Sequence, residues 1–143
     1  MNFDTRLNHI WWTLRLTFGL VPIVAGLDKY FNLLTNWEQY LNPAIPGMLH
    51  LSPLAFMHMV GIVEICAGVL VLTPITGYAS YIVMLWLVGI AGNLLVQGRF
   101  LDIAVRDIVL AVAAYSLARL TQVRQDATQQ VRVTKADIAM QRI

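Results

Sequence analysis

Four ionisable residues lie within otherwise apolar stretches of the sequence: Arg15, Lys29, Glu64 and Asp107. Glu64 lies about halfway along its stretch, which would place it near the middle of a bilayer. A charged side chain there costs about 2.5–3.5 kcal/mol on insertion scales. We therefore expect Glu64 to be protonated, paired or turned towards water, and a carboxyl group in that position could pass protons to a small molecule such as a quinone.

Further polar residues are expected near one end of the same apolar stretches. With Glu64 below them, they would form a cluster in the outer half of the membrane, and its members are Lys29, Asn93, Gln97, Arg106 and Asp107. In one interpretation they form buried pairs that fix helix register, such as Lys29–Asp107 or Arg15–Glu64. In the other they line a small polar cavity for a quinone headgroup, a proton or another small polar molecule. A third possibility, that long side chains reach the membrane interface, applies best to Arg15.

The composition indicates that these residues belong to a membrane protein. The chain has 143 residues, of which 58% are hydrophobic and 13% are charged, whereas soluble domains have about 45–50% apolar and about 25% charged residues. The same values exclude a disordered chain. A net charge of +2 does not suggest a nucleic-acid partner. The single cysteine, Cys66, excludes an internal disulfide framework and a multi-cysteine metal site built by one chain.

Hydropathy predicts an all-α integral membrane protein, a four-helix bundle. A bilayer core about 30 Å thick needs about 20 apolar residues in a helix. Four stretches meet this requirement and form a transmembrane domain over residues 1–121, with helices at about 10–31, 53–72, 76–96 and 103–121 and an outer loop at 32–52. Residues 122–143 form a polar cytoplasmic tail. We expect a frayed helix on the membrane surface there, with disorder or docking on a partner as the alternatives.

Basic residues predict the orientation of the helices, because cytoplasmic segments are enriched in lysine and arginine. Four spans place both termini on one side of the membrane. That side has more basic residues, namely Arg6, Arg119, Arg124, Arg132, Lys135 and Arg142. The opposite side has Lys29, Arg99 and Arg106. Both termini are therefore expected to be cytoplasmic.

Small residues recur on one face of each predicted helix. Residues three and four positions apart share a helix face. Small side chains let helix backbones approach closely in lipid, and polar groups also turn towards the interior. The residues predicted to pack helices together are Gly19, Gly26, Gly61, Gly68, Gly89, Ala111 and Ala114.

Cofactor motifs are weak in this sequence. His50 and His58 could serve as axial ligands of a haem, but nothing else supports haem, and histidine at the membrane interface is the commoner explanation. We predict no metal site. A quinone is the cofactor that the buried polar cluster would suit.

An ordered set of motifs resembles the DoxX family of small four-helix bacterial membrane proteins. The motifs are Arg15-Leu-Thr-Phe-Gly19 and Ala25-Gly-Leu-Asp-Lys-Tyr-Phe31 in the first helix, Gly61-Ile-Val-Glu-Ile-Cys-Ala-Gly-Val-Leu70 in the second and Arg106-Asp107 in the fourth. The family includes the membrane subunit of thiosulfate:quinone oxidoreductase. The resemblance implies a multi-pass protein of the bacterial inner membrane with a redox-associated role. It gives Arg15, Lys29, Glu64 and Asp107 as candidate family residues, although the chain has no redox-active cysteine pair.

The function expected from these observations is that of an accessory or structural subunit of a larger, redox-linked and quinone-associated membrane complex. One alternative is a quinone-interacting oxidoreductase subunit that uses the polar cluster around Glu64. A second alternative is a small transporter. On its own the chain is not expected to be an enzyme; at most it is the membrane subunit of a quinone-linked oxidoreductase. The expected partners are membrane lipids and other subunits of the complex, and not nucleic acid.

Overall fold

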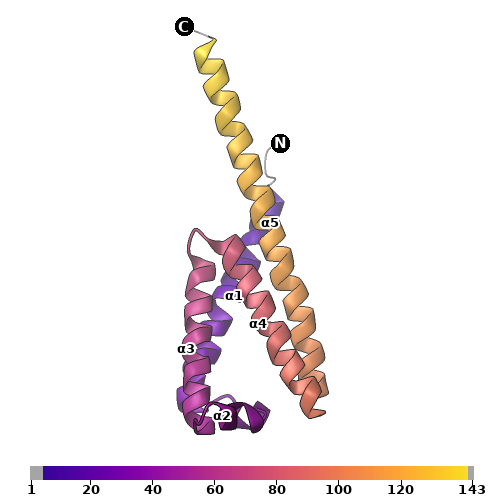
Figure 1. Cartoon of the computed structure of the whole chain (residues 1–143). Coiled ribbons are helices and arrows are strands. Elements are labelled where there is room, and N and C mark those ends of the chain that lie inside the picture. Colours follow the sequence, from indigo (N-terminus) through magenta and orange to yellow (C-terminus); the bar gives the residue numbers. More distant parts are fainter. Residues whose placement is uncertain (1–4, 142–143) are drawn as a thin grey trace.

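The structure is a computed structural model that describes residues 5–141, and within them it contains helices and no strand. The predicted all-α class is confirmed. The elements, in chain order, are α1 (Thr5–Phe31), the 3-10 helix η1 (Trp37–Tyr40), α2 (Ala44–Met48), α3 (Pro53–Leu72), α4 (Thr76–Gln97) and α5 (Leu101–Met140) (Figure 1). Residues 1–4 and 142–143, which include Arg142, lie outside the described residues.

Within residues 5–141, three helices are long and apolar enough to cross a membrane: α1, α3 and α4. Their outward faces bear large hydrophobic side chains such as Val21 and Leu85, which are 59% and 64% exposed. Such faces are typical of helices in contact with lipid, and they indicate a membrane protein. The stretch at 103–121, also predicted to span, is not among the three. It is interrupted by Arg106, Asp107 and Arg119.

Helices α1 and α3 form a closely packed antiparallel pair because glycines face each other across it. A Cβ atom on Gly26 would lie 2.5 Å from the carbonyl oxygen of Gly61, and one on Gly61 would lie 2.6 Å from that of Gly26. A Cβ atom on Gly68 would likewise collide with the carbonyl oxygen of Gly19. Only the absence of side chains allows the two backbones to approach this closely.

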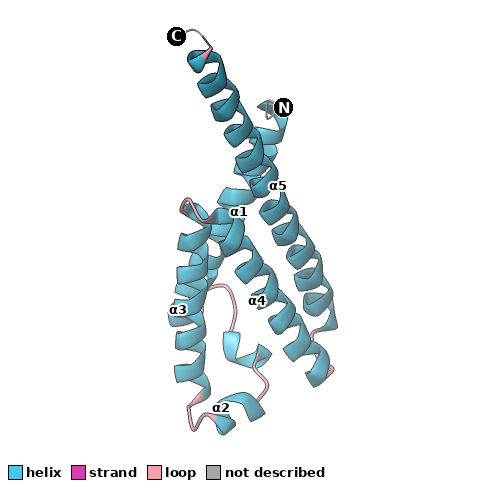
Figure 2. Ribbon diagram, turned by 45° about the horizontal axis from the view of Figure 1, so that its top comes forward, coloured by secondary structure: helices cyan, strands magenta, loops and turns pink. Residues whose placement is uncertain are grey.

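Helices α4 and α5 form the second antiparallel pair, and small residues again line the contact. Ala79 on α4 is 1% exposed, and Ala114 on α5 is fully buried. The two pairs meet at the end of the molecule near the α3–α4 turn, where Trp11 and Phe18 of α1 join the same core. At the other end the pairs diverge, and the segment containing η1 and α2 lies there (Figures 1 and 2).

Two helix boundaries follow local rules of capping. The Ser52 hydroxyl accepts a hydrogen bond from the Ala55 backbone N–H at 3.2 Å, and Pro53 occupies the first turn of α3, as expected for an N-terminus. Helix α4 ends at Gly98, whose φ of +64° is a left-handed conformation that favours glycine.

Residues 122–140 differ from the expected frayed helix on the membrane surface, because they continue α5 without a break. The chain contains no glycine or proline between Leu101 and Met140, and many residues of this extension have good helix propensity. In Figure 1 the extension projects beyond the α3–α4 turn along the axis of α5. Its side chains are mostly exposed.

Candidate functional site

A cavity of about 580 Å³ lies between the two helix pairs at their divergent end. Its walls come from α1, α3, α4 and α5 and from the segment around η1. Most of the lining is apolar and includes Phe56, Val60 and Leu87. Ligand cavities commonly combine apolar walls with a few convergent polar groups, and the polar residues here are those that could carry chemistry.

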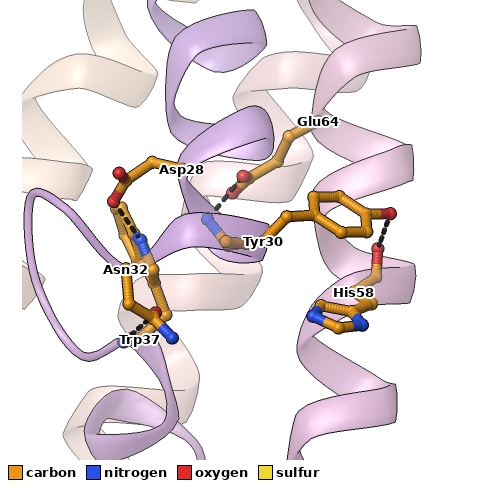
Figure 3. A network of polar contacts seen from close by, with 7 residues as sticks. Asp28, Tyr30, Asn32, Trp37, His58 and Glu64 are labelled. Carbon is orange, nitrogen blue, oxygen red and sulfur yellow. Dashed lines mark hydrogen bonds and ion pairs between the residues drawn. The ribbon is translucent and has the colours of Figure 1, made fainter.

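An ion pair between Lys29 of α1 and Glu64 of α3 forms one wall of the cavity. Lys29 Nζ donates to Glu64 Oε2 at 2.5 Å, and the two residues are 4% and 8% exposed. Figure 3 shows the Glu64 side chain directed at α1 across the helix pair. Each charge is stabilised by the other, because a lone buried charge would be strongly unfavourable.

An aromatic residue from the loop covers this ion pair. The Trp37 ring lies with its centroid 3.7 Å from Lys29 Nζ, a cation–π contact. Its indole N–H donates to Asp28 Oδ2 at 2.8 Å (Figure 3). Asp28 also accepts hydrogen bonds from the backbone N–H groups of Leu33 and Leu34. Asp28 thereby fixes both the start of the loop and the position of Trp37.

Two amide side chains of α4 attach the other end of η1 to the helix. Asn93 Nδ2 and Gln97 Nε2 both donate to the carbonyl oxygen of Tyr40, at 2.9 and 3.0 Å. The Tyr40 ring meets Phe100 edge-on, with 4.8 Å between centroids. The loop is therefore tied to α4 as well as to α1, and it forms the floor of the cavity.

Several polar groups at the cavity have no hydrogen-bond partner. The indole nitrogen of Trp86 and the Oδ1 atom of Asn93 are buried and unpartnered. Trp86 Nε1 approaches the Glu64 carboxylate with a geometry that falls short of a hydrogen bond. Asp107 is 8% exposed, lines the cavity and takes part in none of the hydrogen bonds or ion pairs of residues 5–141. Buried polar groups are nearly always satisfied, so unpartnered groups at a cavity wall indicate a place for a polar ligand.

The structure brings together most of the predicted cluster. The cavity is lined by Lys29, Glu64, Asn93, Arg106 and Asp107. Gln97 adjoins it through Tyr40. The pairing differs from both predicted pairs, because Lys29 bonds to Glu64 and not to Asp107. Asp107 lies on α5, on the far side of the cavity from the closely packed α1–α3 pair.

Arg15 lies at the C-terminal end of α3 and forms no hydrogen bond or ion pair with Glu64, which is near the middle of that helix. Its guanidinium donates to the carbonyl oxygens of the last residues of α3 and of the following turn, namely Val71 at 3.2 Å, Leu72 at 2.5 Å and Thr73 at 2.9 Å. These carbonyls have no partner within a helix that ends there. Arg15 therefore caps α3 and is not part of the cavity.

The predicted packing residues divide into two groups. Gly26, Gly61 and Gly68 lie where a Cβ atom would meet a backbone carbonyl oxygen, whereas a Cβ atom at Gly19 would meet the side chain of Leu72. Ala111 and Ala114 are buried between α5 and its neighbours, together with Leu117 and Ala118. Gly89 is different, because nothing lies within 4 Å of a Cβ placed there and the residue lines the cavity.

Sequence reasoning did not single out three aromatic residues of the site. Trp37 and Tyr40 lie in the predicted outer loop at 32–52, and their contacts with Lys29 and Asn93 depend on how this loop folds back. Trp86 shares a face with Asn93 at helical spacing, and that spacing was the signal that could have identified it.

Neither His50 nor His58, the two candidate haem ligands, lines the cavity. His58 stacks on the Tyr30 ring with 4.5 Å between centroids, and its carbonyl accepts a hydrogen bond from the Tyr30 hydroxyl (Figure 3). His50 is exposed in the loop before α3, with a φ of +52°. Among residues 5–141, no three histidine, cysteine, aspartate or glutamate side chains gather as metal ligands would.

Comparison of the chain with protein-family models, with curated proteins and with solved structures found no match.

Proposed function

We propose that this chain is a DoxX-like membrane subunit that holds a quinone-type molecule for a larger redox-linked complex. The observation that supports this most directly is the cavity next to the Lys29–Glu64 pair, where the buried indole N–H of Trp86 lies near the Glu64 carboxylate but does not complete a hydrogen bond to it. The sequence has one cysteine and therefore no redox-active cysteine pair. Oxidation and reduction of the quinone would therefore be the work of partner subunits.

A quinone suits this cavity because it combines a compact headgroup, two carbonyl acceptors and an apolar body. The volume of about 580 Å³ falls within the range of about 300–1,000 Å³ typical of small-molecule sites. Trp86 Nε1 and Lys29 Nζ are donors for the carbonyl oxygens, whereas Glu64 and Asp107 can hold the protons that reduction of a quinone consumes. The apolar walls would accommodate the start of an isoprenoid tail.

The membrane arrangement is part of the same proposal. Residues 101–121 of α5 lie along α4, and Thr121 reaches the start of α4 near Gly77. If α4 crosses the bilayer, this part of α5 crosses with it, and its charges face the cavity or the ends of the helix. The result is a four-helix bundle with both termini in the cytoplasm, in the inner membrane of a bacterium.

A binding experiment tests the quinone proposal. The purified protein in lipid nanodiscs is titrated with decylubiquinone and with a menaquinone analogue, and binding is followed by thermal stabilisation and by quenching of tryptophan fluorescence. We expect saturable binding that Trp86→Phe weakens about tenfold, which corresponds to about 1.4 kcal/mol for a lost hydrogen bond. The matched control is Trp12→Phe, because Trp12 is exposed at the far end of α1.

Two results would count against a quinone site. The first is a lack of saturation with either quinone. The second is an affinity that is the same in the wild type, Trp86→Phe and Trp12→Phe, which would show that the quinone partitions into the lipid without a site on the protein.

The role as a subunit has separate support in the extension of α5. Residues 122–140 form an exposed helix beyond the α3–α4 turn, and such a helix is available to other subunits of a complex. Purification from native membranes in a mild detergent, followed by mass spectrometry, should recover stoichiometric partner proteins. A lone protein that reduces quinone by itself would contradict the accessory role.

A further inference from the structure

A second cavity, of about 690 Å³, lies at the opposite end of the molecule. It is formed where α1 and α5 meet the turn between α3 and α4. We call it the arginine pocket, and the lining residues used below are Trp11, Arg15, Thr121, Arg124, Gln125 and Arg132. Three of these residues are arginines, and among the described residues no aspartate or glutamate lines the pocket.

Two of the arginines share one aromatic ring. The guanidinium carbon of Arg124 lies 3.9 Å from the centroid of the Trp11 ring, and that of Arg15 lies 4.8 Å from it. The ring itself is fixed, because its N–H donates to the Thr121 hydroxyl oxygen at 2.8 Å and Trp11 is only 3% exposed. Two like charges are thus held close together by one buried side chain, and they repel each other.

Within residues 5–141, no carboxylate pairs with the arginines of the pocket. Arg15 uses its guanidinium for the carbonyls at the end of α3, which are neutral groups. The guanidinium groups of Arg124 and Arg132 form no hydrogen bond or ion pair within residues 5–141, and that of Arg124 contacts only the Trp11 ring. Their donors therefore face the pocket, together with the amide of Gln125. An anion placed among them would relieve the repulsion and accept several charge-assisted hydrogen bonds.

The depth of the arginine pocket along the membrane-spanning helices indicates which kind of anion it would bind. The pocket is level with the α3–α4 turn, where the apolar segments of both helices end. At this depth a membrane has its phosphate groups. Basic pockets between transmembrane helices on the cytoplasmic side are suited to anionic lipid headgroups, and arginine binds phosphate oxygens in a bidentate manner.

We propose that the arginine pocket binds a phosphate group, and that its source is the headgroup of an anionic phospholipid. Three arginines favour a headgroup with two phosphates, such as that of cardiolipin, over one with a single negative charge. The bound lipid would join the α5 extension to α1 and to the α3–α4 turn. This site is separate from the quinone cavity and does not depend on it.

Lipid titration with matched variants tests this proposal. The full chain in detergent is titrated with cardiolipin, phosphatidylglycerol and phosphatidylcholine, and bound lipid is measured by native mass spectrometry and by thermal stabilisation. We expect cardiolipin to bind at least tenfold more tightly than phosphatidylcholine. In the double variant Arg124→Gln/Arg132→Gln this preference should disappear. Arg15 is left intact because it caps α3.

The matched control is Arg119→Gln/Lys135→Gln. It removes the same charge from the same helix, but Arg119 and Lys135 do not line the pocket. The control should retain the preference for cardiolipin, and circular dichroism should show both variants folded. An equal loss of preference in the two variants would overturn the proposal, because it would show non-specific attraction to the surface. A wild-type protein without preference among the lipids would overturn it as well.

A further titration distinguishes the two sources of phosphate. If inorganic phosphate at millimolar concentration stabilises the wild type as much as cardiolipin does, and Arg124→Gln/Arg132→Gln abolishes that effect, a phosphate site is supported and the lipid source is overturned. If inorganic phosphate has no effect while cardiolipin stabilises, the lipid source is supported.

Discussion

Lys29 Nζ and Glu64 Oε2 are 2.5 Å apart, and this ion pair joins α1 to α3 beside the point where their glycines meet. The close approach of the two backbones is what allows a lysine on one helix to reach a glutamate on the other. The pair and the glycine contact thus form one structural unit. The Trp37 ring covers the Lys29 ammonium group and separates it from the part of the cavity next to η1.

The first prediction concerns the loss of one partner of this pair. Glu64→Gln removes the carboxylate that is hydrogen-bonded to the buried Lys29, and breaking a buried ion pair in this way typically costs about 3–5 kcal/mol. We expect a lower free energy of unfolding, measured by chemical denaturation in mixed micelles. The double variant Lys29→Met/Glu64→Gln removes both charges and should recover most of the loss. Equal destabilisation in the single and double variants would show that the pair is not coupled.

The second prediction concerns the glycine contact. Gly61→Val should separate α1 from α3, because a side chain there meets the Gly26 carbonyl. Overpacking of this kind costs about 1–3 kcal/mol or more, and it should lower the melting temperature. Gly89→Ala is the matched control, since a Cβ at Gly89 meets nothing within 4 Å. The control should be neutral or slightly stabilising, because alanine has a higher helix propensity than glycine.

The third prediction separates two contributions of Trp37. Trp37→Phe keeps an aromatic ring over Lys29 but removes the hydrogen bond to Asp28. The expected loss of stability is about 1.5–3 kcal/mol, as for a hydrogen bond to a charged group. Trp37→Leu removes the cation–π contact as well and should lose more. Thermal unfolding of both variants measures the difference, and identical losses would show that the ring contributes nothing beyond its hydrogen bond.

The sequence predicts the helical elements well because their signals are local. Apolar length indicates α1, α3 and α4, while Ser52 and Gly98 mark boundaries through capping and backbone conformation. The continuation of α5 to Met140 was not predicted, since the loss of apolar periodicity after Thr121 suggested that the regular helix ends there. The absence of glycine and proline from residues 122–140 is the signal that predicts a continuous helix there.

The site was only partly predictable, for a different physical reason. Burial of charge in an apolar segment identifies Lys29, Glu64 and Asp107 as residues that must face inwards. Which of them pair depends on which helices are neighbours, and hydropathy does not contain that information. The loop contacts of Trp37 and Tyr40 are less predictable still, because they depend on how residues 32–52 fold across the open end of the helices.

The last prediction concerns the orientation of the helices in the membrane. In a Cys66→Ser background, a cysteine at Lys135 in the α5 extension and a cysteine at Arg99 in the α4–α5 loop report on opposite ends of α5, and both positions are exposed. A membrane-impermeant maleimide should label Lys135→Cys in inside-out vesicles and Arg99→Cys in right-side-out vesicles or intact cells. The reason is that basic residues are retained on the cytoplasmic side, and the extension is the more basic end. Labelling of both cysteines from the same side would contradict a fourth span, because it would place the two ends of α5 in one compartment. The reverse pattern would retain the span but put the arginine pocket in the outer leaflet.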